Sequence, residues 1–262
     1  MEKSTYPIPN SSTDLTGQVA VVTGAGSGLG QRFATVLAAA GASVAVVGRR
    51  EARLAEVASE IVSRGGRCLP VAADITQEDA CVSVIDQASQ QLGPVSILVN
   101  NAGIPDARRP HRIPIDIVDA VINTNFRAPF LLSTEVAKRL IADELPGRIV
   151  NISSSTSFYY TGGAAALYSS TKAAINRLTE VLAVEWVKYG INVNAIAPGA
   201  FETDMMQGMI DRVGDPSSSF PRKRLGNPAQ LDSTLLYLVS PASDMVTGTV
   251  IKVDDAQHAL GV

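Results

Sequence analysis

The sequence predicts an α/β fold: a doubly wound parallel sheet of about seven strands, with helices on both faces, in a single domain. Two observations predict it. Short apolar runs alternate with helical stretches along nearly the whole chain, and these runs are apolar on both faces, as in strands that are covered on two sides. The chain has 262 residues, of which 46% are hydrophobic and 18% charged, and this suffices for one large core.

The expected strands, in chain order, are Val19–Thr23, Ser43–Val47, Cys68–Ala72, Ile97–Val99, Arg148–Ile152, Asn192–Ala197 and Val250–Val253. The expected helices are Leu29–Ala40, Ala52–Arg64, Glu78–Leu92, Ile115–Ile141, Leu167–Tyr189 and Pro228–Val239. Residues 1–14, rich in Ser, Thr, Pro and Asn, are expected to form a flexible N-terminal arm before a domain that spans 15–262. Residues 202–226 look irregular and predict a mobile lid over a ligand, the alternative being a plain surface excursion.

Charge and cysteine content exclude several classes of function. The formal net charge is −3, which gives no reason to expect a nucleic acid or an anionic membrane as partner. Cys68 and Cys81 have neither the spacing of metal ligands nor that of a disulfide framework, so no metal site is expected. The chain shows no membrane-length apolar stretch and no signal-peptide pattern at its start, and we expect a cytoplasmic protein.

A glycine-rich turn follows the first expected strand. The run Thr23-Gly24-Ala25-Gly26-Ser27-Gly28-Leu29-Gly30 joins that strand to a helix start. Free backbone N–H groups and the positive end of the helix dipole favour an anion there, and glycine lets the backbone come close to a pyrophosphate. The next strand follows at the distance expected for a βαβ unit. The turn therefore predicts a dinucleotide-binding enzyme, the alternative being a glycine-rich turn without a ligand.

Tyr168 and Lys172 form a second candidate site. Positions i and i+4 share one face of a helix, and a nearby cation favours the ionised form of a phenol, whose pKa is otherwise near ~10. Such a pair can transfer protons. The pair alone is weak evidence, but Ser153, Ser154 and Ser155 end the fifth strand, where polar groups face the ligand crevice of a parallel sheet.

Together these motifs resemble the short-chain dehydrogenase/reductase family, from about Gly17 to Val253. The resemblance implies a Rossmann-type fold and hydride transfer between NAD(P) and a carbonyl or secondary alcohol. The catalytic residues it implies are Asn125, Ser154, Tyr168 and Lys172. The cofactor-binding residues it implies are Gly24, Ser27, Gly28, Leu29, Gly30, Asp74, Ile75, Asn101, Ala102, Gly103, Tyr168, Lys172, Pro198, Gly199 and Thr203.

Each catalytic residue takes a role from this resemblance. Tyr168 donates a proton to the substrate oxygen, and Ser154 hydrogen-bonds that oxygen. Lys172 lowers the tyrosine pKa and holds the ribose, while Asn125 supports a proton-relay water. Counting from the strand places the family serine at Ser154, whereas counting back from Tyr168 places it at Ser155. We favour Ser154, because strands keep their register while loops absorb insertions.

Two further features depart from or refine the family pattern. After the last strand the family often has Asp-Gly-Gly, but this chain has Asp254-Asp255-Ala256. The second strand ends near Gly48 and is followed by Arg49 and Arg50, so no carboxylate stands ready for a ribose diol. A guanidinium at Arg49 suits a 2′-phosphate, which favours NADP(H) over NAD(H). The alternative is that both arginines face solvent.

The expected substrate is a small or cyclic ketone. This follows from an apolar and aromatic set near the predicted site: Ile104, Pro105, Phe158, Tyr159, Tyr160, Phe201 and the methionines of residues 202–226. A basic cluster at Arg108, Arg109, His111 and Arg112 is either a solvated loop or a contact for an anionic substrate or acyl-carrier protein. A 3-oxoacyl-thioester reductase and a non-catalytic nucleotide sensor are the alternatives. The resemblance also implies a homotetramer.

Overall fold

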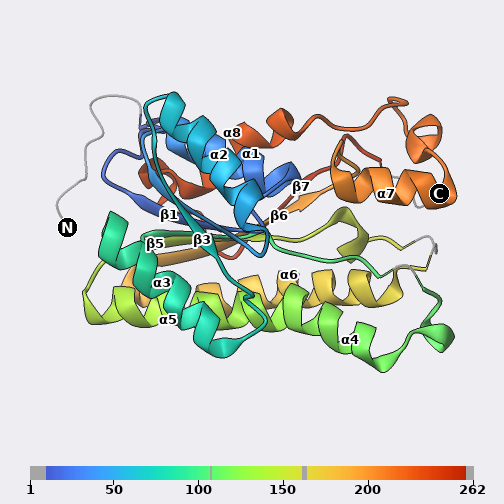
Figure 1. Cartoon of the computed structure of the whole chain (residues 1–262), viewed down its shortest axis with the longest axis horizontal. Coiled ribbons are helices and arrows are strands. Elements are labelled where there is room, and N and C mark those ends of the chain that lie inside the picture. The colour runs from blue at the N-terminus through green and yellow to red at the C-terminus, as the bar shows by residue number, and fades with distance from the viewer. Residues whose placement is uncertain (1–9, 107, 161–163, 258–262) are drawn as a thin grey trace.

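A single parallel sheet runs through the part of the chain that this computed structural model describes, residues 10–106, 108–160 and 164–257. Its seven strands lie in the order β3-β2-β1-β4-β5-β6-β7, as Figure 1 shows. The strands are β1 Val19–Thr23, β2 Ser43–Gly48, β3 Arg67–Ala72, β4 Ile97–Asn100, β5 Gly147–Ile152, β6 Ile191–Pro198 and β7 Val250–Val253. The order reverses between β1 and β4, which is where ligands bind in such sheets.

Helices cover both faces of the sheet, as the upper and lower layers of Figure 1 show. The upper layer holds α1 Gly28–Ala39, α2 Glu51–Ser63 and α8 Asp232–Val239. The lower layer holds α3 Glu78–Leu92, α4 Ile115–Ile122, α5 Ala128–Ala142 and α6 Ala166–Trp186. The remaining α-helix of the described residues, α7 Asp204–Val213, follows β6. The predicted fold class is confirmed by this arrangement.

Two apolar cores explain why the strands are apolar on both faces. One core packs Phe33 and Leu54 from the upper helices against the sheet, and the other packs Leu132 and Ile175 from the lower helices. Every residue of β1, β4 and β6 is buried. The edge strand β3 is largely exposed and contains Pro70, a residue that edge strands tolerate because they need fewer ladder hydrogen bonds.

Two expectations need correction. The expected single helix Ile115–Ile141 is interrupted by a π-helical turn, η2 Asn123–Arg127, which divides α4 from α5. Residues 202–226 are not irregular throughout, because they contain α7, which the Thr203 side chain caps by accepting from Met206 N. Apolar periodicity does not predict this helix, because it contains Gly208 and a mixture of polar and methionine side chains.

The remaining expectations concern the ends of the chain, membranes and metals. Residues 1–9 of the expected N-terminal arm lie outside the described residues. None of the described helices is long and apolar enough to cross a membrane. Within the same residues, no group of three or more His, Cys, Asp or Glu side chains is placed to hold a metal ion.

Candidate active site

A cavity of about 1140 Å³ opens at the carboxyl ends of the strands. The residues that follow β1, β2, β3, β4, β5 and β6 all contribute to its wall, together with the start of α6 and one side of α7. Of the predicted cofactor residues, those on this wall are Gly24, Ser27, Gly28, Leu29, Arg49, Asp74, Ile75, Asn101, Ala102, Gly103, Tyr168, Lys172, Pro198, Gly199 and Thr203. The topology thus gathers segments far apart in sequence around one space.

The glycine turn is shaped so that only glycine fits at three of its positions. Gly24 and Gly28 have φ values of +65° and +57°, which side chains disfavour. A Cβ on Gly30 would lie 2.3 Å from the Gly24 carbonyl oxygen, so this buried residue supports the turn from behind without lining the cavity. The turn therefore presents bare backbone at the start of α1, a cradle that fits the pyrophosphate of a dinucleotide.

Asn101 holds this turn in place. Its Nδ2 donates to the carbonyls of Thr23 and Gly24 at 2.9 and 3.3 Å. The Thr23 hydroxyl in turn accepts from the backbone N–H groups of Asn101 and Ala102, both at 3.0 Å. A Cβ on Gly24 would lie 2.8 Å from the Ala102 Cα, so the two loops are in close contact. The side chain of Asn101 thus holds the glycine turn in its conformation.

Two arginines stand where the second strand ends. Arg49 and Arg50 both line the cavity and are exposed, and no acidic side chain follows β2 before Glu51. Arg50 Nη2 donates to the Ser27 hydroxyl at 3.0 Å and so reaches across to the glycine turn. Sequence reasoning favoured Arg49 and missed this contact of Arg50, which depends on the bend between β2 and α2.

Asp74 and Ile75 follow β3 on the same side of the cavity. The Asp74 carboxylate accepts from the backbone N–H of Thr76 at 3.1 Å and from its hydroxyl at 2.9 Å. These bonds use Oδ1, which fixes the orientation of the exposed side chain at the cavity edge. Ile75 is buried and adds an apolar surface beside it.

Tyr168 and Ser154 meet deep in the cavity. Tyr168 lies in the first turn of α6, and Ser154 follows β5. Burial raises the pKa of the Tyr168 phenol, and a hydrogen bond with the Ser154 side chain opposes that rise. Ser155 also lines the cavity, but the hydrogen bond with the phenol belongs to Ser154. The choice of Ser154 over Ser155 as the family serine stays a prediction.

Lys172 lies one turn beyond Tyr168 and is buried. Its Nζ lies 5.6 Å from the centre of the Tyr168 ring and donates to the Ile152 carbonyl at 2.7 Å. Burial lowers the pKa of Lys172 to about 8. That Lys172 lowers the tyrosine pKa stays a prediction, since its ammonium group lies beside the Tyr168 ring but binds a backbone carbonyl.

Asn125 lies in the π-helical turn, fully buried. Its Oδ1 accepts from the Ile104 N–H at 2.8 Å, and its Nδ2 donates to the Ile104 carbonyl at 3.0 Å. A Cβ on Gly103 would lie 3.4 Å from Lys172 Nζ and 3.5 Å from Asn125 Oδ1, so glycine keeps the space between these two side chains open. Asn125 itself stands behind the cavity wall. A π-helical turn often marks a functional position within a helix.

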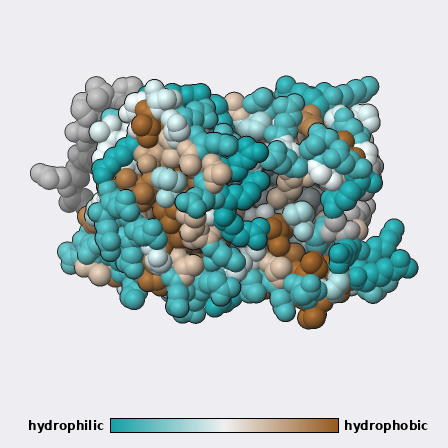
Figure 2. Space-filling view, in the orientation of Figure 1, coloured by the Kyte–Doolittle hydropathy of each residue, from teal (hydrophilic) through white to brown (hydrophobic). Residues whose placement is uncertain are grey.

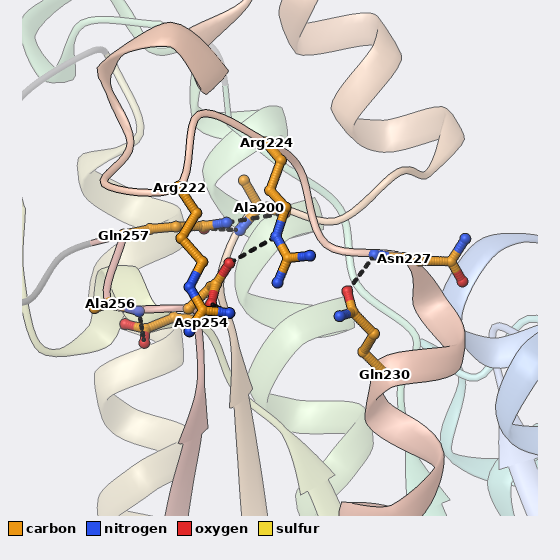
Figure 3. Close-up of polar contacts among 9 residues, drawn as sticks. Ala200, Arg222, Arg224, Asn227, Gln230, Asp254, Ala256 and Gln257 are labelled. Atoms are coloured by element: carbon orange, nitrogen blue, oxygen red, sulfur yellow. Dashed lines mark hydrogen bonds and ion pairs between the residues drawn. The ribbon is translucent and has the colours of Figure 1, made fainter.

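The loop after β6 faces the glycine turn across the cavity. Gly28 approaches Thr203, since a Cβ on the glycine would lie 3.5 Å from the threonine Cβ. Behind this loop, the Gln257 side chain both accepts from and donates to the backbone of Ala200, at 2.6 and 3.3 Å, as Figure 3 shows. The C-terminal turn therefore holds the segment that contains Pro198 and Gly199.

The far end of the cavity is apolar and aromatic. The walls there include Ile104, Pro105, Tyr159, Tyr160, Phe201, Met205, Met206, Met209 and Phe220, with Arg212 as a cation. Phe158 does not belong to the cavity wall; its ring lies 5.5 Å from Lys252 Nζ. The basic cluster at 108–112 is also outside the wall, and its side chains are exposed, in agreement with the solvated-loop alternative.

Comparison with known proteins identifies the family. The family model described as short chain dehydrogenase matches residues 18–213, which is most of the chain. The chain belongs to the short-chain dehydrogenase/reductase family. Its predicted membership is confirmed, and with it the general activity: the protein is an NAD(P)-dependent oxidoreductase that acts on CH–OH groups.

Similar family members act on different substrates. One is a 2-dehydro-3-deoxy-D-gluconate 5-dehydrogenase of Escherichia coli, 36% identical over 93% of this chain and 96% of its own length. Another is a 3-oxoacyl-[acyl-carrier-protein] reductase of Synechocystis, 35% identical over 92% of this chain and 97% of its own length. Sequence similarity at this level does not fix the substrate of this chain.

Solved structures confirm the fold. A short-chain type dehydrogenase/reductase from Mycobacterium marinum is 33% identical and has a TM-score of 0.91 over 95% of this chain and 98% of its own. A gluconate 5-dehydrogenase from Burkholderia cenocepacia in complex with NADP and tartrate is 30% identical, with a TM-score of 0.89 over 96% and 99%. A 3-ketoacyl-(acyl-carrier-protein) reductase from Brucella melitensis complexed with NADH is 33% identical, with a TM-score of 0.85 over 93% and 99%.

Proposed function

We propose that the protein transfers hydride between NADP(H) and a small or cyclic ketone or the matching secondary alcohol, with Tyr168 as the acid–base residue. The observation that carries the proposal is the pairing of Tyr168 with Ser154 in one cavity with the glycine turn. A group that moves a proton and a group that binds an oxygen thus share one cavity with the phosphate cradle.

Each side chain has a defined task in this proposal. The bound nicotinamide supplies or accepts the hydride. In the direction of reduction, Tyr168 donates its proton to the substrate oxygen and Ser154 hydrogen-bonds that oxygen, stabilising the charge that develops there. Lys172 places a cation 5.6 Å from the tyrosine ring and is available to the ribose if it leaves the Ile152 carbonyl. Gly103 leaves the space between Lys172 and Asn125 open for a relay water.

The preference for NADP(H) belongs to this proposal. Two guanidinium groups, Arg49 and Arg50, line the cavity beside the glycine turn, and a 2′-phosphate would meet both without facing a carboxylate at the end of β2. Arg50 is held by Ser27, so part of the entropy cost of ordering it is already met. Guanidinium suits phosphate because it offers several N–H donors in a planar fork.

The substrate class follows from the far end of the cavity. Tyr159, Tyr160 and three methionines of α7 offer apolar surface, which suits a compact or cyclic ketone better than a polyol. A 3-oxoacyl thioester is the second candidate, supported by the Synechocystis and Brucella relatives. Arg212 gives the cavity wall one cation near α7, which would also receive a sugar acid of the kind named for the Escherichia coli relative.

The first experiment is a paired fluorescence titration with NADPH and NADH, followed by turnover of cyclic ketones, aliphatic ketones, acetoacetyl thioesters and keto sugar acids. We expect tighter binding of NADPH and turnover of cyclic or small ketones. Arg50→Ala should weaken NADPH binding by about tenfold and leave NADH binding nearly unchanged, since it removes charge-assisted hydrogen bonds to the 2′-phosphate alone. Equal weakening for both cofactors would contradict the proposed preference.

Tyr168→Phe tests the catalytic assignment. The variant keeps the ring and loses the hydroxyl, so turnover should fall by about a hundredfold or more while NADPH binds as in the wild type. Tyr189→Phe is the matched control, because Tyr189 is exposed in the turn after α6 and its ring lies 4.9 Å from Lys188 Nζ. Turnover by Tyr168→Phe within a few-fold of the wild type would rule out this role.

A further inference from the structure

A buried carboxylate binds the start of the helix that carries Tyr168. Asp106 belongs to the loop after β4 and is 4% exposed. Its Oδ1 accepts from the backbone N–H of Tyr168 at 3.0 Å, and its Oδ2 accepts from that of Leu167 at 3.2 Å. The two residues it binds lie 61 and 62 positions further along the chain. Asp106 was not among the predicted site residues.

Helix α6 has no cap of its own. The N-cap residue is Ala165, which has no side-chain acceptor, and the first turn contains no acidic residue. The first N–H groups of a helix lack partners within it and carry partial positive charge, so they require an acceptor when they are buried. Asp106 satisfies two of them from a distant loop and places a negative charge where the helix dipole favours one.

The same loop is fixed at a second point. Ile104, two residues before Asp106, is bound on both its N–H and its carbonyl by the Asn125 side chain. Among the residues that the structure describes, no cation forms an ion pair with Asp106, so its burial is compensated by the hydrogen bonds to α6. One short segment thus connects Asn125 with the backbone of Tyr168.

We infer that Asp106 is a positioning residue for Tyr168: it anchors the first turn of α6 and sets where the phenol lies relative to Ser154. The inference rests on the proposed function for its catalytic consequence. The pKa of Tyr168 depends on where the phenol lies, because the Ser154 hydrogen bond lowers it. It also depends on the positive helix end, which favours the phenolate and which Asp106 neutralises. Removal of Asp106 should therefore misplace the phenol and shift the Tyr168 pKa.

The test compares Asp106→Asn and Asp106→Ala with the wild type and with a control of similar structure. Asn192 is the control, because it is buried and its Nδ2 donates to two distant backbone carbonyls, at the opposite end of β6. In the Asp106 variants we expect kcat to fall by about tenfold or more, with NADPH affinity unchanged within about twofold. Asn192→Ala should lower the Tm without lowering kcat.

A second readout does not depend on turnover. The protein has six tyrosines, and each can be labelled with ¹³C at the ring carbon that bears the hydroxyl and titrated by NMR. The signal that is missing in Tyr168→Phe is the signal of Tyr168. Its pKa should differ between Asp106→Asn and the wild type by about half a unit or more. Because asparagine keeps one oxygen acceptor, this variant carries the test if the alanine variant does not fold.

The outcomes separate the two proposals. Unchanged kcat and unchanged Tyr168 titration in Asp106→Asn would overturn the positioning role, as would a loss of kcat that Asn192→Ala reproduces at the same loss of Tm. A wild type that turns over no compound of the panel, but shows the shift of the Tyr168 pKa on Asp106→Asn, would overturn the proposed function and support the anchoring of Tyr168.

Discussion

Lys172 shows how a residue that we propose to be catalytic can reduce the stability of the fold. Burial lowers its pKa to about 8 from an ordinary value of 10.5. Between these two pH values the unfolded chain binds more protons than the folded one, so the contribution of Lys172 to folding becomes more favourable as pH rises. Below pH 8 the full cost is present, about 3 kcal/mol for this difference in pKa.

Lys172→Met should therefore stabilise the folded protein at pH 7. We expect a gain of about 1–2 kcal/mol, because the variant removes the buried charge but leaves the Ile152 carbonyl without its donor. The gain should shrink as pH rises from 8 to 10.5. Urea unfolding of both proteins across this range measures it, with the exposed Lys138→Met as control. A gain that does not depend on pH would show that burial of charge is not its cause.

At the scale of elements, the C-terminal turn and the segment after α7 are joined by charge. Arg222 and Arg224 contact the Asp255 carboxylate at 3.3 and 2.9 Å, close to the Gln257 contacts of Figure 3. Asp255 and Ala256 have φ values of +51° and +59°, the region that glycine occupies without strain. Where the family often has two glycines, this chain has Asp255 and Ala256. The backbone is strained at these two residues, but the Asp255 carboxylate forms ion pairs with the segment after α7.

Asp255→Asn should loosen this segment without unfolding the protein. Exposed ion pairs contribute about 0–1 kcal/mol each, so the Tm should change little, while trypsin should cleave after Arg222 or Arg224 about threefold faster or more. Asparagine tolerates the left-handed backbone, so the change isolates the charge. High salt should have the same effect on the wild type.

The control for this variant is Asp143→Asn. Asp143 is exposed and caps the end of α5, and no ion pair of Asp143 occurs among the described residues. Its replacement should leave the rate of cleavage as in the wild type. Equal cleavage rates for Asp255→Asn and the wild type would mean that Asp255 does not restrain the segment.

The sequence predicts the sheet well and the site in part. The bounds of the strands can be predicted because the strands are runs of residues that are apolar on both faces. The glycine turn can be predicted because its glycines occupy positions where a Cβ would not fit. The π-helical turn at Asn125 could not be read, since its residues also fit an α-helix. Asp106 and Arg50 were missed because their partners, Tyr168 and Ser27, are brought near only by the fold. Long-range pairing of single polar residues leaves no periodic signal in the chain.

At the scale of the whole molecule, the lower helix layer exposes apolar side chains. Ile115 of α4 and Val184 of α6 are 73% and 76% exposed, and Phe130 of α5 is also exposed. Brown patches lie along the lower part of the space-filling view in Figure 2, where Figure 1 shows this layer. Helices α4 and α6 are in contact, and apolar surface on neighbouring helices is typical of interfaces. It supports the proposal that four copies of this chain associate, in a protein that we propose to be cytoplasmic.

Val184→Glu tests this association. In an interface between identical copies related by a two-fold axis, one substitution places two carboxylates near each other in apolar surroundings, which costs several kcal/mol in the free energy of association. Light scattering should show four copies for the wild type and one or two for the variant. Val62→Glu is the control, because Val62 is 55% exposed on α2 in the opposite layer. A monomeric wild type would exclude the association. A Val184→Glu variant that still forms tetramers would place the contact elsewhere.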